Sequence, residues 1–559
     1  MIKKILFGAF FFIFTTSIGQ HLENKVLFSV EGEPVYAEEF LNVYNKNQDL
    51  VEVKSERNID EYLQMFIDYK LKIKAAEALG LDANPEFQRE FLGYRNQLAK
   101  KFMTDSHVTD ALVHEAYERT IEEVNAAHIL LLLEEDATPS DTLEVYNRAI
   151  ELRKKIINGG DFAALAKQFS EDPSVRKNAG ELGWFSAFKM VYPFEDAAYK
   201  TEVGTISMPV RTNFGYHLIK VNDKRKSRGE VVVAHIMVAD KENVNAEKKI
   251  NQIYSELKES DDFENLAIKY SDDKATAEKG GRLKRFGAGE LNSPEFEDLA
   301  FNLKTPGEIS EPFKTQYGWH IVKLIEKYPI ASFAETQRFL EDKVRKDSRS
   351  RVITEAFVQK LKNDYKIGGN SKSLEYFEDL IEEKNSDLNL SADEEQDLKE
   401  KVLVKVRDTS LTYFDFYKFY KLKNLKSDKD SNVNVLMKQW HDDYINNFIL
   451  EYHQNHLEAE NSEFASIAKE YKEGLLLFEL MEDKIWNAAK QDSIGLEKFY
   501  QDHKSQYEKD ADFEEIKGLV INDYQSFLEK KWLNELRETY KVKMNKKVFS
   551  NLKKSLGKD

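Results

Sequence analysis

Four histidines recur at matching places in two successive stretches of the chain. His128 and His235 both follow an alanine within an apolar segment, 107 residues apart. His217 and His320 both stand two residues after a glycine, 103 residues apart. An imidazole can hydrogen-bond or exchange protons with a substrate, although a histidine on an apolar strand is more often a satisfied core residue. The repetition therefore needs the surrounding sequence to decide between these roles.

The histidines belong to two ordered sets of similar segments. The first set is NAAHILLLL at 125–133, QFSEDPS at 168–174, GELGWF at 180–185, MVYPFEDAAY at 190–199 and TNFGYHLIKV at 212–221. The second set is VVAHIMV at 232–238, KYSDDKA at 269–275, GGRLKRF at 280–286, LNSPEFEDLAF at 291–301 and TQYGWHIVKLIE at 315–326. Agreement in order and spacing over so many positions predicts a tandem domain duplication.

Each set resembles the parvulin-type (PpiC, rotamase) peptidyl-prolyl isomerase domain. The resemblance rests on an AHI strand, an FS-x-D segment, a G-x-LG-x-F turn, a FEDAA helix start and a closing T-x-FG-x-H strand. It implies two domains, each a small antiparallel sheet with surrounding helices, over 121–226 (domain 1) and 227–328 (domain 2). It also implies catalysis of X–Pro bond rotation, which meets a barrier of roughly 18–20 kcal/mol. Such a site binds the proline ring, excludes water and favours the twisted amide, and it uses no cofactor or metal.

The resemblance also assigns roles to individual residues. The catalytic candidates are His128, Asp172 and His217 in domain 1 and His235, Asp273 and His320 in domain 2. The substrate-binding candidates are Leu182, Met190, Phe194, Thr212 and Phe214 in domain 1 and Leu283, Leu291, Phe296, Thr315 and Tyr317 in domain 2. Some parvulins have cysteine where Asp172 stands, but others have aspartate, and this chain contains no cysteine.

Domain 2 departs from the family pattern in two ways. Gly183 of domain 1 is replaced by Lys284, and a lysine is hard to accept where a glycine backbone is strained. One extra residue also precedes Phe296 in LNSPEF. The sequence therefore predicts that domain 2 binds proline poorly or is inactive.

The N-terminus has the features of a secretory signal. Lys3 and Lys4 precede a ten-residue apolar run, Ile5–Phe14, and small residues follow before Gln20. Cleavage after residue 19 would give a periplasmic protein without a stable membrane span. A membrane anchor is the alternative, although the apolar run is short for one.

Composition limits the function classes. The 559 residues predict several domains, and 41% hydrophobic content is enough for packed cores. A formal net charge of −17 argues against nucleic acid as a partner, because phosphate contacts need clustered lysine and arginine.

Helical modules flank the duplicated domains. The expected N-terminal module covers 20–120, a helical connector covers 329–375, and a mainly helical C-terminal module covers 376–559. The segment 402–421 aligns without gaps to 26–45 at an offset of 376, which predicts that the C-terminal module is a degenerate copy of the N-terminal one. The aromatic run at 413–420 is expected to pack in a core, with a client-binding surface as the alternative.

The whole chain is thus expected to be an α+β multidomain protein that resembles the periplasmic chaperones SurA and PpiD. The implied function is prolyl isomerisation and chaperoning of unfolded or nascent exported polypeptides, with outer-membrane proteins as a plausible client class. Two alternatives stay open. One is a non-catalytic holdase that uses the duplicated domains only to bind peptides. The other is a membrane-tethered folding factor similar to PpiD.

Overall fold

The computed structural model describes residues 25–48, 58–135, 137–240, 245–260, 262–291, 293–368, 371–384, 389–424, 433–507 and 513–556. The predicted signal segment 1–19 lies outside them. The chain forms two compact bodies. We call Met1–Phe102 with Gln454–Asp559 the terminal body and Met103–His453 the central body. The predicted fold class, α+β with small antiparallel sheets and helical modules, is confirmed.

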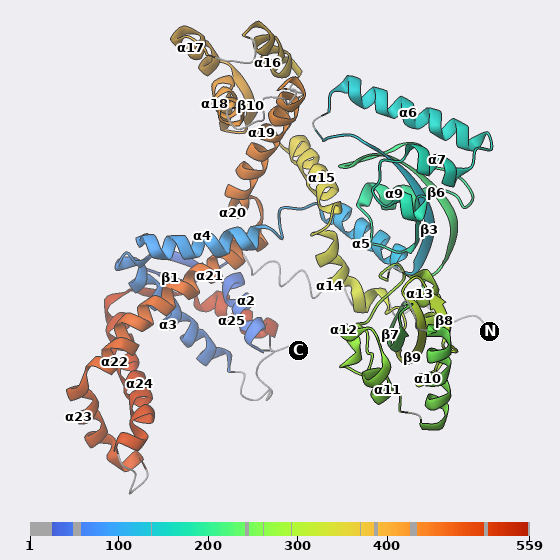
Figure 1. The fold of residues 1–559 in the computed structure, drawn as a ribbon. Coiled ribbons are helices and arrows are strands. Elements are labelled where there is room, and N and C mark those ends of the chain that lie inside the picture. The colour runs from blue at the N-terminus through green and yellow to red at the C-terminus, as the bar shows by residue number, and fades with distance from the viewer. Residues whose placement is uncertain are drawn as a thin grey trace, which may run out of the picture. The chain divides into compact units, whose positions relative to one another are not determined.

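The terminal body joins the two ends of the chain, coloured blue and red in Figure 1. Its N-terminal elements are β1 (Val26–Val30), β2 (Glu33–Tyr36), α2 (Ala37–Gln48), α3 (Ile59–Ala78), η2 (Leu81–Ala83) and α4 (Pro85–Ala99). Its C-terminal elements are α20 (Leu457–Glu460), α21 (Ser462–Met481), η3 (Glu482–Asn487), α22 (Ala488–Gln491), α23 (Ser493–His503), η4 (Lys504–Gln506), α24 (Phe513–Thr539), β12 (Val542–Met544) and α25 (Lys546–Leu556).

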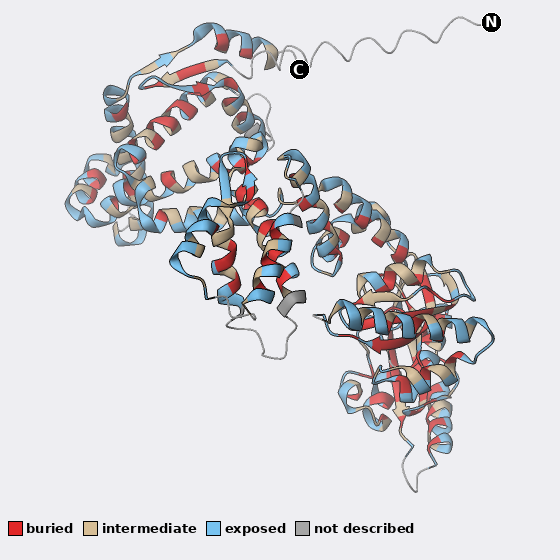
Figure 2. Cartoon of the chain, turned by 90° about the horizontal axis from the view of Figure 1, so that it is seen from above, coloured by how far each residue is buried: buried red, intermediate tan, exposed pale blue. Residues whose placement is uncertain are grey.

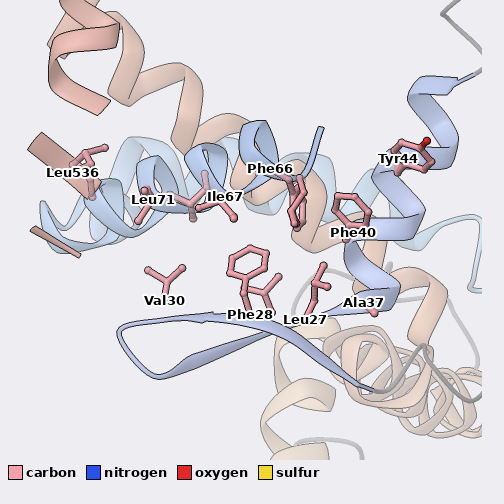
Figure 3. Packing of buried hydrophobic residues seen from close by; sticks show 14 of the residues in the cluster. Leu27, Phe28, Val30, Ala37, Phe40, Tyr44, Phe66, Ile67, Leu71 and Leu536 are labelled. Atoms are coloured by element: carbon pink, nitrogen blue, oxygen red, sulfur yellow. The ribbon is translucent and has the colours of Figure 1, made fainter. Parts of the chain in front are cut away.

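One core holds these distant segments together. Strand β12 pairs antiparallel with β1, opposite β2, so the two chain ends share a three-stranded sheet. Its aromatic centre consists of Phe28, Phe40 and Phe66. The ring centroid of Phe66 lies 6.0 Å from that of Phe28 and 5.5 Å from that of Phe40. Figure 3 shows Leu536 of the C-terminal part in the same cluster. Burial of this apolar surface fixes the sheet and the helices around it.

The central body contains the two predicted domains. Domain 1 consists of β3 (Glu122–Leu132), α6 (Pro139–Ile157), α7 (Phe162–Phe169), α8 (Val175–Asn178), β4 (Glu181–Phe185), α9 (Tyr192–Lys200), β5 (Val210–Thr212) and β6 (Gly215–Lys226). Domain 2 consists of β7 (Glu230–Val238), α10 (Ala246–Ser260), α11 (Phe263–Tyr270), α12 (Lys274–Ala277), α13 (Pro294–Asn302), β8 (Phe313–Thr315) and β9 (Gly318–Tyr328).

The sheets of the two domains share one topology with a difference at one edge. Domain 1 has the antiparallel order β4-β3-β6-β5, and domain 2 has β7-β9-β8. In place of β4, the described residues of domain 2 form two isolated bridges, Val231 with Phe286 and Ala234 with Arg282. Figure 2 shows that the strands are largely buried and that the covering helices expose their outer sides. The long central strands therefore provide a rigid platform for the side chains that they carry.

The charged segment between the domains is ordered. Strand β6 continues to Lys226, and the buried carboxylate of Glu123 accepts hydrogen bonds from Ser227 Oγ and the Arg228 backbone N–H, both at 3.0 Å. A side chain at Gly229 would meet the Tyr328 carbonyl oxygen at 2.2 Å. The charged segment 224–230 thus begins as the end of a strand and is held by a buried acid.

The remaining central elements are helices and one hairpin. They are α5 (Ser106–Thr120), α14 (Phe333–Val344), α15 (Arg349–Asp364), α16 (Ser371–Glu383), α17 (Ala392–Glu400), β10 (Val402–Val406), β11 (Thr409–Thr412), α18 (Tyr413–Asn424) and α19 (Val433–Asn455). Phe416, Tyr417 and Tyr420 of α18 are at most 2% exposed and form part of one hydrophobic core. The aromatic run at 413–420 therefore packs inward, as expected.

The strands of the hairpins β1–β2 and β10–β11 pair in the same register, and each paired residue of the second hairpin lies 376 positions after its equivalent in the first. Val26 lies opposite Tyr36 and Val402 opposite Thr412, and both hairpins have an irregularity at the same place. The residues that begin the two turns, Glu31 and Arg407, are both left-handed with φ of 50°. The rest of the predicted C-terminal module divides at residue 454, because the later helices complete the terminal body. The predicted domain boundaries themselves stay a prediction.

Candidate active sites

The central strands of each domain place two histidines on one face of the sheet. In domain 1, Ile219 lies opposite His128 and Leu130 lies opposite His217. The two histidines are therefore diagonal neighbours, which lets long side chains meet. In domain 2, Val322 opposite His235 and Met237 opposite His320 give the same arrangement.

The two histidine pairs have nearly the same geometry. The Nδ1 atoms of His128 and His217 are 3.3 Å apart, and so are those of His235 and His320. All four residues are buried, with 3–5% of their surface exposed. A threonine completes each pair, because Thr212 Oγ1 lies 2.8 Å from His217 Nε2 and its counterpart Thr315 lies 2.8 Å from His320 Nε2.

In domain 2 the hydrogen bonds run in one direction. Hydrogen bonds from Thr276 and His235 outweigh the effect of burial and lower the pKa of Asp273, so this carboxylate only accepts. His235 Nε2–H then donates to Asp273 Oδ2 over 2.8 Å, which leaves His235 Nδ1 as an acceptor. His320 Nδ1–H donates to His235 Nδ1, and Thr315 Oγ1–H donates to His320 Nε2. The tautomers follow from this network of partners.

Domain 1 lacks the corresponding bond to its aspartate. His128 Nε2 lies 3.2 Å from Asp172 Oδ2 but outside hydrogen-bond geometry, and among the described residues it has no hydrogen-bond partner. The other oxygen, Asp172 Oδ1, accepts from the Ser174 backbone N–H at 2.7 Å and from Ser174 Oγ at 2.5 Å. Asp172 is thus held by its own turn more than by the histidine.

Burial keeps the histidines neutral. It lowers the pKa of His217 to about 3 and that of His320 to about 4, with a smaller contribution from the neighbouring histidine in each case. It also lowers the pKa of His128 and His235, against the opposing effect of the adjacent aspartates. Neutral imidazoles can relay hydrogen bonds without placing a net charge beneath the substrate.

An aromatic ring forms the apolar floor beside each pair. Phe194 is 3% exposed and meets His217 edge-on at 5.2 Å, and Phe296 is 4% exposed and meets His320 edge-on at 5.4 Å. Leu182 and Met190 pack partly buried in the cluster of Phe194, as Leu283 and Leu291 do in that of Phe296. Every predicted site residue except two therefore gathers around the histidines as a buried or half-buried group.

The two exceptions are the rim residues. Phe214 is 57% exposed and Tyr317 is 51% exposed. Each donates its backbone N–H to the site threonine, Thr212 over 3.2 Å and Thr315 over 3.1 Å. Their side chains are therefore available to a peptide beside the pocket, while their backbones hold the threonine hydroxyl in place.

A buried glutamate positions the pocket wall in each domain. Glu297 accepts the Leu291 backbone N–H at 2.7 Å and that of Gly289 at 2.9 Å. Glu195, with no exposed side-chain surface, accepts the Phe188 backbone N–H at 2.8 Å and pairs with Arg119 and Arg349. Burial raises the pKa of both glutamates, which the arginines and backbone donors oppose. The loops carrying Met190 and Leu291 are thereby fixed.

Sequence reasoning missed two residues of the domain 2 site. Phe313 stacks on His320 at 5.6 Å and contacts Phe296 at 6.0 Å, where domain 1 has Val210. Thr276 Oγ1 lies 3.1 Å from His235 Nε2 and 2.6 Å from Asp273 Oδ2. The sequence could have pointed to Phe313 and Thr276 because an aromatic side chain and a hydroxyl stand close to the recurring segments. Neither position is part of the recurring pattern itself.

The reason for doubting domain 2 does not hold in the structure. Gly183 has a φ of +73°, a conformation that favours glycine, but its replacement Lys284 is exposed and is not among the residues with positive φ. The backbone differs because the described part of domain 2 forms no strand equivalent to β4. The extra residue before Phe296 is also accommodated, since Leu291 still packs in the apolar cluster of Phe296.

Each site thus combines an apolar floor, a neutral hydrogen-bond chain and a half-open rim. Residues 112–225 and 233–326 each match the family model of a PPIC-type PPIASE domain. The chain therefore contains two domains of this type in tandem, and the predicted duplication of an isomerase domain is confirmed.

Individual relatives match the same region. The chain is 33% identical over 234 residues to Chaperone SurA of Hahella chejuensis, covering 40% of this chain and 53% of that protein. It is 43% identical over 129 residues to the Foldase protein PrsA of a Geobacillus species, covering 23% and 42%. A solved structure of PrsA from Bacillus anthracis is 25% identical, covers 39% of this chain and 93% of that one, and has a TM-score of 0.17. The chain spans about half the length of the SurA relatives that it matches.

Across the described residues, no helix has the length and apolar character needed to cross a bilayer. The same residues contain no cluster of three or more histidine, cysteine or acidic side chains that could hold a metal ion.

Proposed function

We propose that this protein is a peptidyl-prolyl cis-trans isomerase and a chaperone for unfolded exported polypeptides. The observation that carries the isomerase proposal is the pair of histidine–threonine networks, each packed on a buried phenylalanine. The proline ring would sit on Phe194 or Phe296, and the carbonyl of the preceding residue would turn over the neutral hydrogen-bond chain. Water exclusion and preferential binding of the twisted amide would lower the barrier.

In this proposal the predicted site residues keep their roles. His128, Asp172 and His217 act in domain 1, and His235, Asp273 and His320 act in domain 2. Because both domains have the histidine pair, the threonine and the aromatic floor, we expect both domains to turn over peptides.

The test uses the full chain with one domain impaired at a time. Asp172→Ala with Met190→Ala impairs domain 1, and Asp273→Ala with Leu291→Ala impairs domain 2. Isomerisation of a proline-containing peptide should persist in each double variant and fall to the uncatalysed rate in the fourfold variant. Catalysis undiminished in the fourfold variant would place the activity elsewhere.

A groove in the terminal body favours a holdase role beside catalysis. It has a volume of about 900 Å³ and lies between α2, α3 and α21. Tyr62, Met65 and Phe66 line it, and Met65 is 59% exposed. Exposed apolar surface in a groove is typical of a site for unfolded segments.

Charged residues tie the two walls of this groove together. Lys70 on α3 is 7% exposed, and its Nζ lies 2.6 Å from Glu473 on α21 and close to Glu39 on α2. Tyr69 Oη also donates to Glu473 over 3.0 Å. These bonds join segments about 400 residues apart in the sequence and keep the groove preformed.

Chaperoning is tested separately from catalysis. Met65→Asp should reduce the suppression of aggregation of an unfolded protein, because it places a carboxylate on the apolar wall. Leu519→Asp is the matched control, since Leu519 is 54% exposed in the same body but does not line the groove. Equal loss in both variants would contradict a role for the groove. The fourfold isomerase variant should keep full chaperoning.

Export to the periplasm and outer-membrane clients belong to the same proposal. Lys3, Lys4 and the apolar run that follows support a cleaved signal. Mass spectrometry of the exported protein should find Gln20 at the N-terminus. An intact Met1 in the membrane fraction would favour the tethered alternative.

A further inference from the structure

Thr276 provides a hydroxyl in domain 2 at a position where domain 1 has an apolar side chain. Its Oγ1 donates to Asp273 Oδ2 over 2.6 Å, which is the same oxygen that accepts His235 Nε2–H. Thr276 Oγ1 is itself 3.1 Å from His235 Nε2. The hydroxyl, the carboxylate oxygen and the imidazole nitrogen therefore form a closed triangle of polar atoms.

The local backbone explains why the hydroxyl reaches this point. Asp273 is the N-cap of α12 and accepts the Ala275 backbone N–H with its other oxygen, Oδ1, at 3.2 Å. Thr276 follows Ala275 in the first turn of α12, and its side chain points back toward Asp273 Oδ2. The two carboxylate oxygens thus have separate tasks: one caps the helix and the other faces the histidine.

Domain 1 distributes the same groups differently. There the hydroxyl nearest the aspartate belongs to Ser174, and it bonds to Asp172 Oδ1, away from His128. The position equivalent to Thr276 is Val175, which is 5% exposed and packs in the apolar core. His128 Nε2 is left without a hydrogen-bond partner in the described part of the chain.

We propose that Thr276 is a positioning residue of domain 2: its hydroxyl holds Asp273 Oδ2 against His235 and thereby fixes the direction of the hydrogen-bond chain that ends at Thr315. Thr276 acts through Asp273 and need not contact the substrate. This inference rests on the proposed isomerase function of domain 2. It assigns domain 2 a single set of histidine tautomers and domain 1 a mixture.

The direct test observes the tautomers by NMR in the full chain labelled with ¹⁵N-histidine. In the wild type, His235 should be protonated at Nε2 alone, whereas His128 should give averaged signals. Thr276→Val, which is nearly isosteric, should shift His235 toward the averaged pattern, and Thr276→Ser should restore the wild-type pattern. Ser174→Ala is the matched control in domain 1 and should leave the His128 signals in place.

Kinetics of the full chain carrying Asp172→Ala and Met190→Ala provide the functional readout. In this background, Thr276→Val should lower kcat roughly threefold to tenfold with little change in KM, the effect of losing one orienting hydrogen bond. Thr276→Ser should recover most of the rate. A merely structural role would lower the melting temperature and leave both the tautomer and kcat of the folded protein unchanged.

Several results would overturn the inference. They are unchanged His235 signals in Thr276→Val, a Thr276→Ser variant as impaired as Thr276→Val, and a Ser174→Ala shift as large as that at His235. Thr276→Ala replaces Thr276→Val if the latter does not fold, with the same expected tautomer change. Absence of isomerisation in the wild type would contradict the proposed function, but the NMR result would still decide the role of Thr276.

Discussion

Domains 1 and 2 place the same histidine pair on the same strands but support it differently. The Nδ1–Nδ1 distance is 3.3 Å in both, and both pairs end on a threonine at 2.8 Å. The two pairs differ in their further partners. His235 Nε2 is hydrogen-bonded to Asp273 and Thr276, while His128 Nε2 lies near a misaligned Asp172 and has no hydrogen-bond partner among the described residues. The duplicated strands preserve the central geometry, and the short segments around them set how firmly it is held.

The difference favours the opposite activity ranking from the one that the sequence suggested. Lys284 and the extra residue before Phe296 indicated that domain 2 would be the weaker site. In the structure domain 2 has the more complete hydrogen-bond chain. Its pocket wall is also more aromatic, because Phe313 stands where domain 1 has Val210. Four predictions sharpen or break this comparison.

The largest effect is expected from removing the floor. Phe194→Ala and Phe296→Ala should each abolish turnover in their own domain and destabilise it by about 3–5 kcal/mol. The loss of stability should be greater for Phe296→Ala, because the Phe296 ring contacts both Phe286 and Phe313, whereas the Phe194 ring contacts Phe185. Thermal unfolding of the full chain measures the difference. Equal costs would show that the added aromatic contact contributes nothing.

Exchanging the pocket wall should change substrate binding more than turnover. Phe313→Val removes the ring that stacks on His320 and should raise KM in domain 2 roughly twofold to tenfold. Val210→Phe in domain 1 should lower KM by a similar factor. Peptide kinetics in the backgrounds with one impaired domain measure both. A change confined to kcat would mean that the wall acts on the transition state instead.

A smaller effect is expected from exchanging Gly183 and Lys284, the pair of positions at which the sequence indicated a weaker domain 2. Gly183→Lys should destabilise domain 1 by about 1 kcal/mol, because φ of +73° is unfavourable for lysine. Lys284→Gly should change the stability of domain 2 by less than that and leave its activity intact. If Lys284→Gly instead restored a missing activity, the lysine would be a genuine impediment.

The smallest effect is expected from pH. The lowered pKa values of His217, about 3, and of His320, about 4, keep these two imidazoles neutral at pH 5, so their protonation should not change turnover between pH 8 and pH 5. Burial lowers the pKa of His128 and His235 as well. Stability should behave otherwise. The unfolded histidines take up protons below about pH 6.5, so the unfolded state binds more protons there and stability falls as pH drops.

Each buried histidine can contribute at most about 1.4 kcal/mol per pH unit to this loss. Thermal unfolding at pH 7.5 and pH 5 checks the direction. A melting temperature that rises on acidification, or turnover that falls with an apparent pKa near that of free histidine, would contradict neutral buried pairs.

Much of the site was predictable because glycine, proline and histidine recur at fixed spacing. His128, Thr212 and Phe194 could be placed by pattern, and so could their counterparts. The choice of carboxylate oxygen at Asp172 and Asp273 could not, since it depends on where a four-residue helix begins. Lys284 was misjudged for a related reason: the loss of an edge strand changed the backbone that the glycine pattern implied.

The fold was predictable in its local elements and not in its long-range assembly. The strand at 26–30, the turn after it and the helix that ends before Gly80 follow from turn and capping signals, whereas the short strand β2 does not. The pairing of β12 with β1 joins residues about 500 positions apart, and three residues of strand carry too little pattern to predict a partner. Closure of the two chain ends into one body is therefore visible only in the structure.

The central claim, that both domains isomerise X–Pro bonds, is tested most directly by peptide kinetics of four full-length proteins. These are the wild type, the two chains with one domain impaired, and the fourfold variant. The account predicts catalysis in the first three, with the higher kcat from the chain that retains domain 2, and the uncatalysed rate in the fourth. Catalysis that depends on domain 1 alone would contradict it.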